Sequence, residues 1–293
     1  MQKFSGVIPA VVTPFDSTGG FSPAAFERLL DRLYKAGVHG VYVCGQTGEG
    51  LLQSVAQREE VAAAAVRCSP SGKTVIIHVG ASCVADAIRL AKHAARTGAH
   101  AISSLPPLGN YSFAEIKAYY QILAAASELP LLIYYFPALS PAITHVQQII
   151  ELCEIPNVVG LKFTDFDLFK MSIVKESGAT VFSGYDEVLV AGLLMGADGG
   201  IGTFYNLVPE LFVQIYELSV AQKWQEARAV QKTINDLIRA FGQLPFFPAV
   251  KRMLAWSGID CGECLPPRRS LSETEESQLR AKLAALGLRG LFY

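Results

Sequence analysis

Asn157-Val-Val-Gly-Leu-Lys-Phe-Thr-Asp165 is a short apolar run that is interrupted by a lysine. Residues 158–161 have the composition of a strand that is buried on both faces. Lys162 stands at the end of this run, between Leu161 and Phe163. An ammonium ion is costly to bury, so these surroundings favour the neutral amine, which can attack a ketone and form a Schiff base. The alternative is that Lys162 simply ends the strand and extends its amine to water.

The same pattern of an apolar run followed by an amphipathic segment recurs along the chain, at a spacing of about 25 residues. Strands are expected at 7–13, 40–44, 74–79, 101–105, 131–135, 158–162, 180–183 and 199–201. Helices are expected at 23–36, with Ser22 as N-cap and Pro23 in the first position, and at 55–67, 84–97, 113–127, 145–153, 168–177, 187–195 and 209–221. Eight such units predict an α/β fold, a closed (β/α)8 TIM barrel, better than an open sheet.

The strand signal disappears after about residue 221. Helices are expected at 222–241 and 248–256, and a last helix begins after Ser272, whose acidic neighbours suit a first turn, and ends near Gly287. We therefore expect a catalytic barrel over residues 1–221 and a C-terminal three-helix segment over residues 222–293.

Composition excludes several classes of protein. The chain has 25 Lys and Arg against 26 Asp and Glu, so its charge gives no reason to expect nucleic acid or an anionic membrane as a partner. No apolar run approaches the ~20 residues that span a bilayer, and the first residues lack the apolar region of a signal peptide. A cytoplasmic protein is expected.

Cysteine and histidine give no metal signature. Cys261 and Cys264 form a single C-x-x-C pair in a Gly/Pro-rich loop, without the second pair or histidines of a zinc site, so free thiols are expected. Of five histidines, His78 is the one at an expected strand end, and local hydrogen bonding explains it better than a ligand role.

Chemistry in such a barrel lies at the carboxyl ends of the strands. Gln46, Thr47 and Gly48 follow the second strand in a glycine-rich turn, where N–H groups and a hydroxyl suit a carboxylate, although a plain tight turn explains them equally well. Tyr134 is near the end of the fifth strand and is either a proton shuttle or a packed ring.

Two further strand ends carry polar groups. Asp186 and Glu187 follow the seventh strand, where they either bind substrate hydroxyls or favour a helix N-terminus. Thr203 follows a glycine cluster after the eighth strand, which permits close approach of a ligand or a tight turn.

Five of these segments occur in an order and at a spacing that resemble a known superfamily: Gly45–Glu49, Tyr134–Ser140, Gly160–Asp165, Gly184–Glu187 and Gly196–Gly202. They resemble the pyruvate-dependent, Schiff-base (class I) aldolases typified by N-acetylneuraminate lyase and dihydrodipicolinate synthase. The similarity extends over nearly the whole chain, including its helical C-terminal part.

The resemblance implies a role for each matching position. Lys162 is similar to the lysine that condenses with the keto carbon of pyruvate or of a 2-oxo acid, and Tyr134 to the general acid/base. Thr47 and the Gly48 backbone resemble the clamp for the pyruvate carboxylate. A protonated imine is an electron sink, so no cofactor and no metal are needed. A homotetramer is also implied.

Residues within these motifs indicate which substrate the chain is expected to take. Leu139 stands where dihydrodipicolinate synthases usually carry an arginine, and leucine cannot pair with a carboxylate. Gly184, Asp186 and Glu187 resemble the lyase loop that holds the polyhydroxylated tail of sialic acid, with hydroxyl side chains near the same substrate at Thr164 and Thr203. The resemblance therefore favours cleavage of a 2-oxo sugar acid, foremost N-acetylneuraminate to N-acetylmannosamine and pyruvate.

Some residues depart from the lyase pattern. Gln46 replaces the usual Ser or Thr, Gly109 is nearest to the position of a tyrosine that many members insert into a neighbouring subunit, and Tyr135–Phe136 are bulky enough to narrow the pocket. Open alternatives are dihydrodipicolinate synthase, an aldolase for another 2-keto-3-deoxy sugar acid, a metal-dependent aldolase and a non-catalytic sensor.

Overall fold

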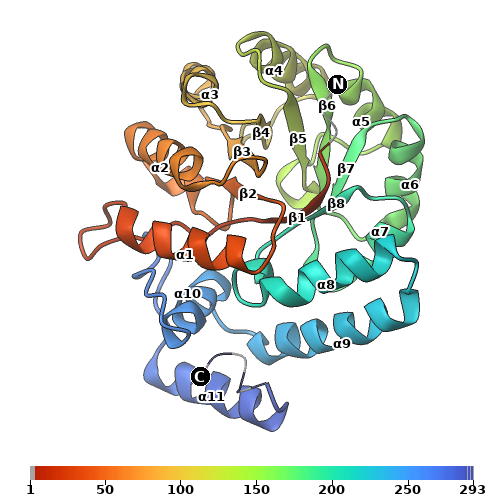
Figure 1. Cartoon of the computed structure of the whole chain (residues 1–293). Helices are drawn as coiled ribbons and strands as arrows, with labels where there is room; N and C mark the ends of the chain where they lie inside the picture. Colours follow the sequence, from red (N-terminus) through yellow and green to blue (C-terminus); the bar gives the residue numbers. More distant parts are fainter. Residues whose placement is uncertain (1–3, 289, 291, 293) are drawn as a thin grey trace.

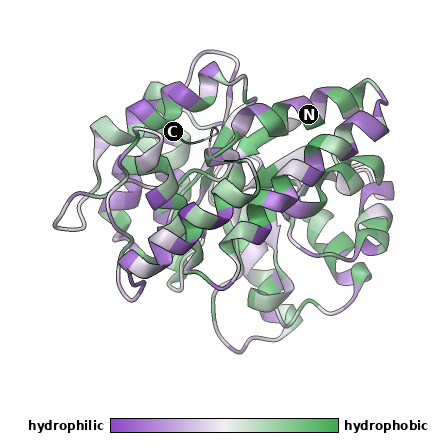
Figure 2. Cartoon of the chain, turned by 90° about the horizontal axis from the view of Figure 1, so that it is seen from below, coloured by the Kyte–Doolittle hydropathy of each residue, from purple (hydrophilic) through white to green (hydrophobic). Residues whose placement is uncertain are grey.

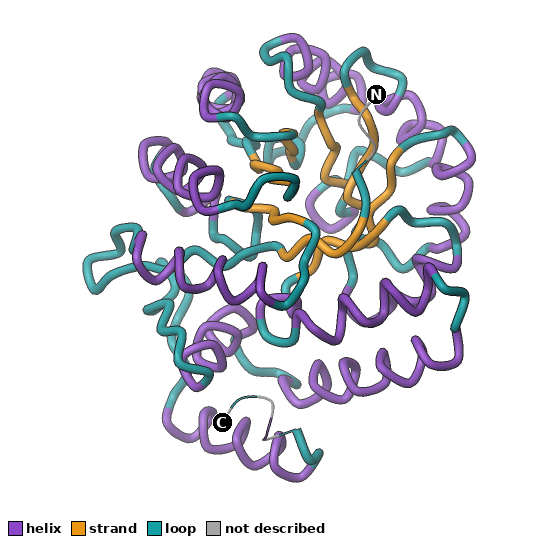
Figure 3. The backbone as a smooth tube through the Cα atoms, in the orientation of Figure 1, coloured by secondary structure: helices purple, strands orange, loops and turns teal. Residues whose placement is uncertain are grey.

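A computed structural model of the chain describes residues 4–288, 290 and 292. Its described residues form one eight-stranded sheet of parallel strands in the order β1-β8-β7-β6-β5-β4-β3-β2. The strands occupy the centre of the molecule and the helices surround them (Figure 3). Their bounds are β1 Gly6–Pro9, β2 Gly40–Val43, β3 Thr74–His78, β4 Ala101–Ser104, β5 Leu131–Tyr135, β6 Val158–Phe163, β7 Thr180–Ser183 and β8 Gly199–Gly202.

The sheet closes on itself just beyond the end of β1. Ala10 forms a parallel bridge with Tyr42 of β2, and the Val11 N–H donates to the Tyr42 carbonyl at 2.9 Å. This contact brings the first and last strands of the sheet order together, so the predicted TIM barrel is confirmed.

One helix follows each strand, as the sequence predicts (Figure 1). These helices are α1 Pro23–Lys35, α2 Val55–Cys68, α3 Val84–Thr97, α4 Phe113–Ala125, α5 Val146–Cys153, α6 Leu168–Glu176, α7 Leu189–Leu194 and α8 Pro209–Val220. Short 3₁₀ turns follow β2, β5, β7 and β8: η1 Gly50–Leu52, η2 Pro137–Leu139, η3 Asp186–Val188 and η4 Phe204–Asn206. Hydrophilic and hydrophobic residues alternate along the outer helices, which is typical of helices with one face on a core (Figure 2).

Two apolar clusters fill the barrel. The larger cluster lies between the strands and the helices, and the smaller one fills the barrel interior from Phe4 to Ile201. Because successive residues of a strand point to opposite faces, β6 contributes to both clusters, which explains its nearly continuous apolar sequence.

Three more helices follow the barrel: α9 Trp224–Phe241, α10 Phe246–Trp256 and α11 Glu273–Ala285. Helix α9 runs beside α8, α10 contacts η4, and α11 packs against α9 (Figure 1). The predicted cap of α11 is confirmed, because Ser272 Oγ accepts from the Glu275 N–H and the Glu275 carboxylate accepts from the Ser272 N–H. The division into two domains stays a prediction.

Several sequence-based boundaries are wrong by two residues or more: helix α4 ends at Ala125 rather than at 127, α9 begins at Trp224 rather than at 222, and three others differ for a physical reason. Strand β1 ends at Pro9 because the backbone beyond Ala10 leaves β8, and the Val12 N–H donates to Asn206 Oδ1. Helix α10 begins at Phe246, since Pro248 is tolerated in a first turn. Helix α7 begins at Leu189 rather than at Glu187, because the Gln231 side chain of α9 bonds the Asp186 carbonyl and the Val190 N–H.

Ser22 precedes α1, but its side chain makes no capping hydrogen bond, whereas Pro23 does occupy the first turn. Within the described ranges, no helix combines the length and the apolar composition that crossing a membrane requires.

Candidate active site

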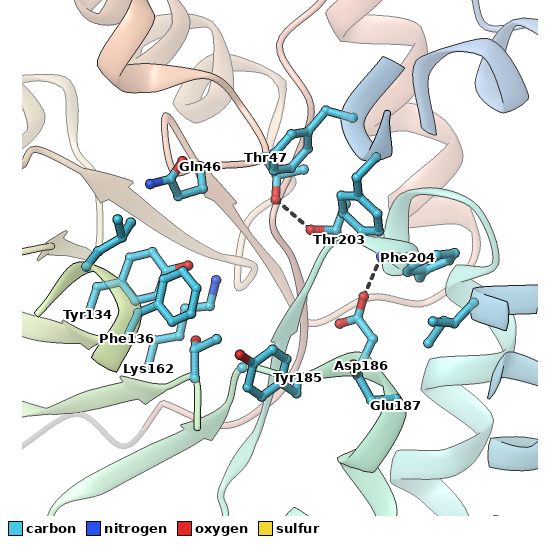
Figure 4. A pocket seen from close by; sticks show the side chains of 16 residues that line it. Gln46, Thr47, Tyr134, Phe136, Lys162, Tyr185, Asp186, Glu187, Thr203 and Phe204 are labelled. Carbon is cyan, nitrogen blue, oxygen red and sulfur yellow. Dashed lines mark hydrogen bonds between the residues drawn. The ribbon is translucent and has the colours of Figure 1, made fainter. Parts of the chain in front are cut away.

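A pocket of about 500 Å³ opens at the carboxyl ends of the strands (Figure 4). This volume is in the ordinary range for small-molecule sites. Every residue that the sequence predicts for the site lines the pocket, except Gly48: Gln46, Thr47, Tyr134, Lys162, Thr164, Gly184, Asp186, Glu187 and Thr203. Residues up to 157 positions apart in the chain thus share one cavity because their strands end on the same side of the barrel.

The register of β5 against β6 places Tyr134 directly beside Lys162. The Lys162 Nζ lies 4.3 Å from the centre of the Tyr134 ring and 5.2 Å from that of Tyr42. Lys162 is 5 % exposed, so the interpretation in which its amine extends to water is wrong. A lysine amine at the floor of an aromatic-walled pocket is placed to meet a ligand there.

Thr47 contacts the opposite side of the pocket. Its hydroxyl lies 2.7 Å from the Thr203 hydroxyl, so the loops after β2 and β8 are joined across the mouth of the barrel (Figure 4). Gly48 does not line the pocket. Its carbonyl accepts from the Thr13 hydroxyl at 2.7 Å and from Gln53 Nε2 at 2.6 Å, which fixes the turn that carries Thr47.

A buried ion pair anchors the same turn from below. Glu49, in the left-handed backbone region at φ 55°, lies 3.0 Å from the Lys251 ammonium of α10. The second carboxylate oxygen of Glu49 accepts from the Leu265 N–H at 2.9 Å. Both charged side chains are buried, so the loop that carries Thr47 depends on the C-terminal helices.

The Asp186 carboxyl group lies deep in the pocket wall. Its Oδ2 accepts from the Phe204 N–H at 2.7 Å, and a side chain at Gly202 would lie within 2 Å of its Oδ1. Burial raises the pKa of Asp186 to about 7, although the Phe204 N–H opposes the rise; Glu187 adds to it and Lys162 lowers it. Asp186 is therefore able to donate or accept a hydrogen bond near neutral pH.

Thr164 offers a further polar group. Its hydroxyl is buried and has no hydrogen-bond partner among the described residues. A Cβ atom at Gly184 would lie 2.0 Å from this hydroxyl, so glycine is required at that position for β6 and β7 to approach each other. Buried hydroxyl groups are normally paired, which makes Thr164 a candidate to bind a ligand.

Aromatic rings form the apolar part of the wall. Tyr134 and Phe136 are stacked, with ring centres 6.3 Å apart, and Tyr185 stacks on Phe166 at 4.1 Å. Phe136 lines the pocket, but Tyr135 does not, because its hydroxyl points to Asp165. The expectation that both residues 135 and 136 narrow the pocket is therefore wrong for Tyr135.

The pocket also contains residues of the later helices that were not predicted from the sequence. Ile238, Phe246 and Phe247 line the pocket from α9 and α10, together with Phe204 after β8. The proline-flanked Phe246–Phe247 pair was a usable signal, because two adjacent aromatic residues at a helix start need an apolar surface to contact.

Metal-binding groups do not gather at the site in the described part of the chain, where no three His, Cys, Asp or Glu side chains could hold an ion together. His78 Nε2 accepts from the Leu105 N–H at 3.0 Å, which agrees with the local hydrogen bonding expected for it. All six cysteines are free thiols, as expected.

The model of the dihydrodipicolinate synthetase family matches residues 3–286. The chain belongs to this family. Among curated family members, the chain is 35 % identical to the N-acetylneuraminate lyase of Rhizobium meliloti, over 97 % of this chain and 95 % of that protein. It is 36 % identical to N-acetylneuraminate lyase 2 of Escherichia coli, over 88 % and 86 %. Its fold matches the solved sialic acid aldolase of Ruminococcus gnavus with a TM-score of 0.92 and 28 % identity, covering both chains fully.

The raised pKa of Asp186 predicts a pH-dependent stability. Its pKa is about 7 in the folded chain against an ordinary value of 3.8, so between these values the folded state binds more protons and stability falls as pH rises. Asp186→Asn removes this dependence. Its stability relative to wild type should rise with pH by up to about 1.4 kcal/mol per unit between about pH 4 and 7 and then level off. Urea unfolding across this range measures the difference, and a pH-independent difference would contradict the expectation.

The buried pair of Glu49 and Lys251 predicts non-additive mutations. Lys251→Met leaves the buried Glu49 carboxylate without its close cation, with only the Arg268 guanidinium 3.9 Å away, and should lower the free energy of unfolding by up to about 3–5 kcal/mol. Adding Glu49→Gln removes that charge while keeping an acceptor for the Leu265 N–H, so the double variant should recover part of the loss. Denaturant unfolding of the two single variants and the double variant tests this, and losses that simply add would show that the two charges are not coupled.

Proposed function

We propose that this chain is a pyruvate-dependent class I aldolase (a carbon–carbon lyase) that cleaves N-acetylneuraminate to N-acetylmannosamine and pyruvate. The observation that carries the proposal is the buried amine of Lys162 beside the Tyr134 ring, at the floor of a pocket lined with hydroxyl and carboxyl groups. Relatives named N-acetylneuraminate lyase, which match nearly the whole chain, support the choice of substrate.

The proposed chemistry uses the chain's own residues. The amine of Lys162, in its neutral form, attacks the keto carbon of the open-chain substrate. The Tyr134 phenol donates a proton to the departing hydroxyl, so that water leaves, a protonated imine remains and Tyr134 becomes a phenolate. Tyr134 then accepts the proton of the substrate hydroxyl as the adjacent carbon–carbon bond breaks, and the imine takes up the electron pair as an enamine. The aldehyde leaves, and Tyr134 donates its proton to the enamine carbon. Water then adds to the imine, Tyr134 takes back the proton that this releases, and pyruvate leaves with the amine restored. Neither a cofactor nor a metal takes part.

The remaining pocket residues fit the two ends of this substrate. Thr47, with the Gln46–Gly48 turn, is proposed to bind the carboxylate beside the imine. Asp186 and Glu187, with the hydroxyl groups of Thr164 and Thr203, are proposed to bind the hydroxylated tail. Leu139 lines the pocket where a dicarboxylate product would need a cation, which disfavours the synthase reaction.

Borohydride trapping with pyruvate tests the covalent step. Wild type should gain the mass of a reduced pyruvate adduct at residue 162, and Lys162→Arg should gain none and lose cleavage activity altogether. Tyr134→Phe should still be trapped but should lose about 10²- to 10⁴-fold in kcat, because only proton transfer is removed. Lys35→Arg, on the exposed side of α1, is the matched control.

The outcomes separate the candidate functions. Pyruvate release from N-acetylneuraminate supports the proposal, and release only from 2-keto-3-deoxygluconate would indicate another sugar acid. Consumption of aspartate semialdehyde with pyruvate would instead indicate a dihydrodipicolinate synthase. Cleavage that survives in Lys162→Arg would refute the mechanism, and wild type without any adduct would indicate a sensor.

We further propose that the chain forms a homotetramer, with one interface on α6 and α7. Phe166, Phe169 and Leu194 are large apolar side chains exposed on or beside these neighbouring helices, and Phe169 is 74 % exposed. Exposed apolar groups that lie together mark association surfaces. Phe169→Glu should convert a tetramer into a smaller species in light scattering, and a wild type that is monomeric would overturn the proposal. The cytoplasmic location stays a prediction.

A further inference from the structure

Gln231 of α9 makes an unusual pair of contacts with the loop after β7. Its side chain is buried, its Oε1 accepts from the Val190 N–H at 3.2 Å, and its Nε2 donates to the Asp186 carbonyl at 2.9 Å. Residues 186 and 190 are four apart, so these two groups are the acceptor and the donor of one ordinary α-helical hydrogen bond. The Gln231 amide takes the place of that bond.

Asn235, one turn further along α9, completes the arrangement. Its Oδ1 accepts from Gln231 Nε2 at 2.9 Å, and its Nδ2 donates to the Glu187 carbonyl at 3.1 Å. Each amide therefore fixes the orientation of the other, and together they bind two successive loop carbonyls that have to be paired when buried.

The contact explains why α7 begins late. The sequence pattern predicts a helix from Glu187, but Asp186 to Val188 form the short turn η3, and α7 begins at Leu189. A side chain that inserts between a helical donor and its acceptor interrupts the helix at that point. In this interrupted conformation, the Asp186 carboxyl reaches the Phe204 N–H and lines the pocket with Glu187.

We propose that Gln231 is a positioning residue for substrate selectivity: by interrupting α7, it holds the carboxyl groups of Asp186 and Glu187 against the hydroxylated tail of the substrate. This inference rests on the proposed function of those two residues. Lys162 and Tyr134, which carry the covalent chemistry, lie on β6 and β5 and make no contact with Gln231. Gln231 is therefore expected to affect recognition of the tail and not imine formation.

Gln231→Leu tests the proposal. Leucine cannot bridge the two backbone groups, so the Val190 N–H pairs with the Asp186 carbonyl and α7 extends backwards by about one turn. We expect kcat/KM for N-acetylneuraminate to fall about 10- to 100-fold. The pyruvate concentration that gives half-maximal borohydride trapping should change less than about twofold, because pyruvate has no tail.

Two further variants keep the test decisive. Asn235→Leu removes the contact with Glu187 and the hydrogen bond that orients Gln231, but it keeps the Gln231 amide that bridges the loop. It should therefore give a smaller loss of the same kind, and it provides the test if Gln231→Leu fails to fold. Gln225→Leu is the matched control, since Gln225 is exposed on the same helix.

Equal losses for N-acetylneuraminate cleavage and for pyruvate trapping would show that Gln231 has only a structural role, and no loss in either would also overturn the inference. A wild type that is trapped by pyruvate but does not cleave N-acetylneuraminate would instead refute the proposed function, and the inference with it.

Discussion

The site depends on one constraint of the barrel, which is the pairing of Tyr134 with Lys162 in adjacent parallel strands. The register sets an amine next to an aromatic ring, and the closed sheet keeps both from water. The strands thus hold the amine, the phenol and the polar groups of the loops around one cavity, where a single ligand can meet all of them.

The C-terminal helices do more than cover the barrel. Lys251 of α10 pairs with Glu49 below the turn that carries Thr47, and Gln231 of α9 holds the loop that carries Asp186. Both of these loops line the pocket. Removal of the later helices would thus loosen both sides of the cavity, while the strands that carry Lys162 would keep their own hydrogen bonds. The loops that carry Thr47 and Asp186 are therefore held by contacts with the C-terminal helices, whereas Lys162 is held by the hydrogen bonds of the sheet.

The sequence predicted the parts of this arrangement that depend on local patterns. Alternating apolar and amphipathic segments indicated the barrel, and the rule that chemistry lies at strand ends selected Lys162, Tyr134 and Thr47 for one pocket. The contacts of Gln231 were not predictable, because they join residues more than 40 positions apart and leave no periodic trace. The predicted start of α7 was wrong for the same reason. The local sequence pattern favours a helix from Glu187, but a side chain distant in sequence interrupts that helix.

The stack of Phe166 on Tyr185 joins the inside of the pocket to the outside of the molecule. Tyr185 lines the cavity, yet the ring behind it belongs to an exposed residue and not to the core. A wall that is backed by solvent on its far side yields more easily than one backed by packed side chains. A protein surface packed against Phe166 would therefore stiffen this part of the cavity wall from outside, and the wall of an isolated chain would deform more easily than that of an associated one.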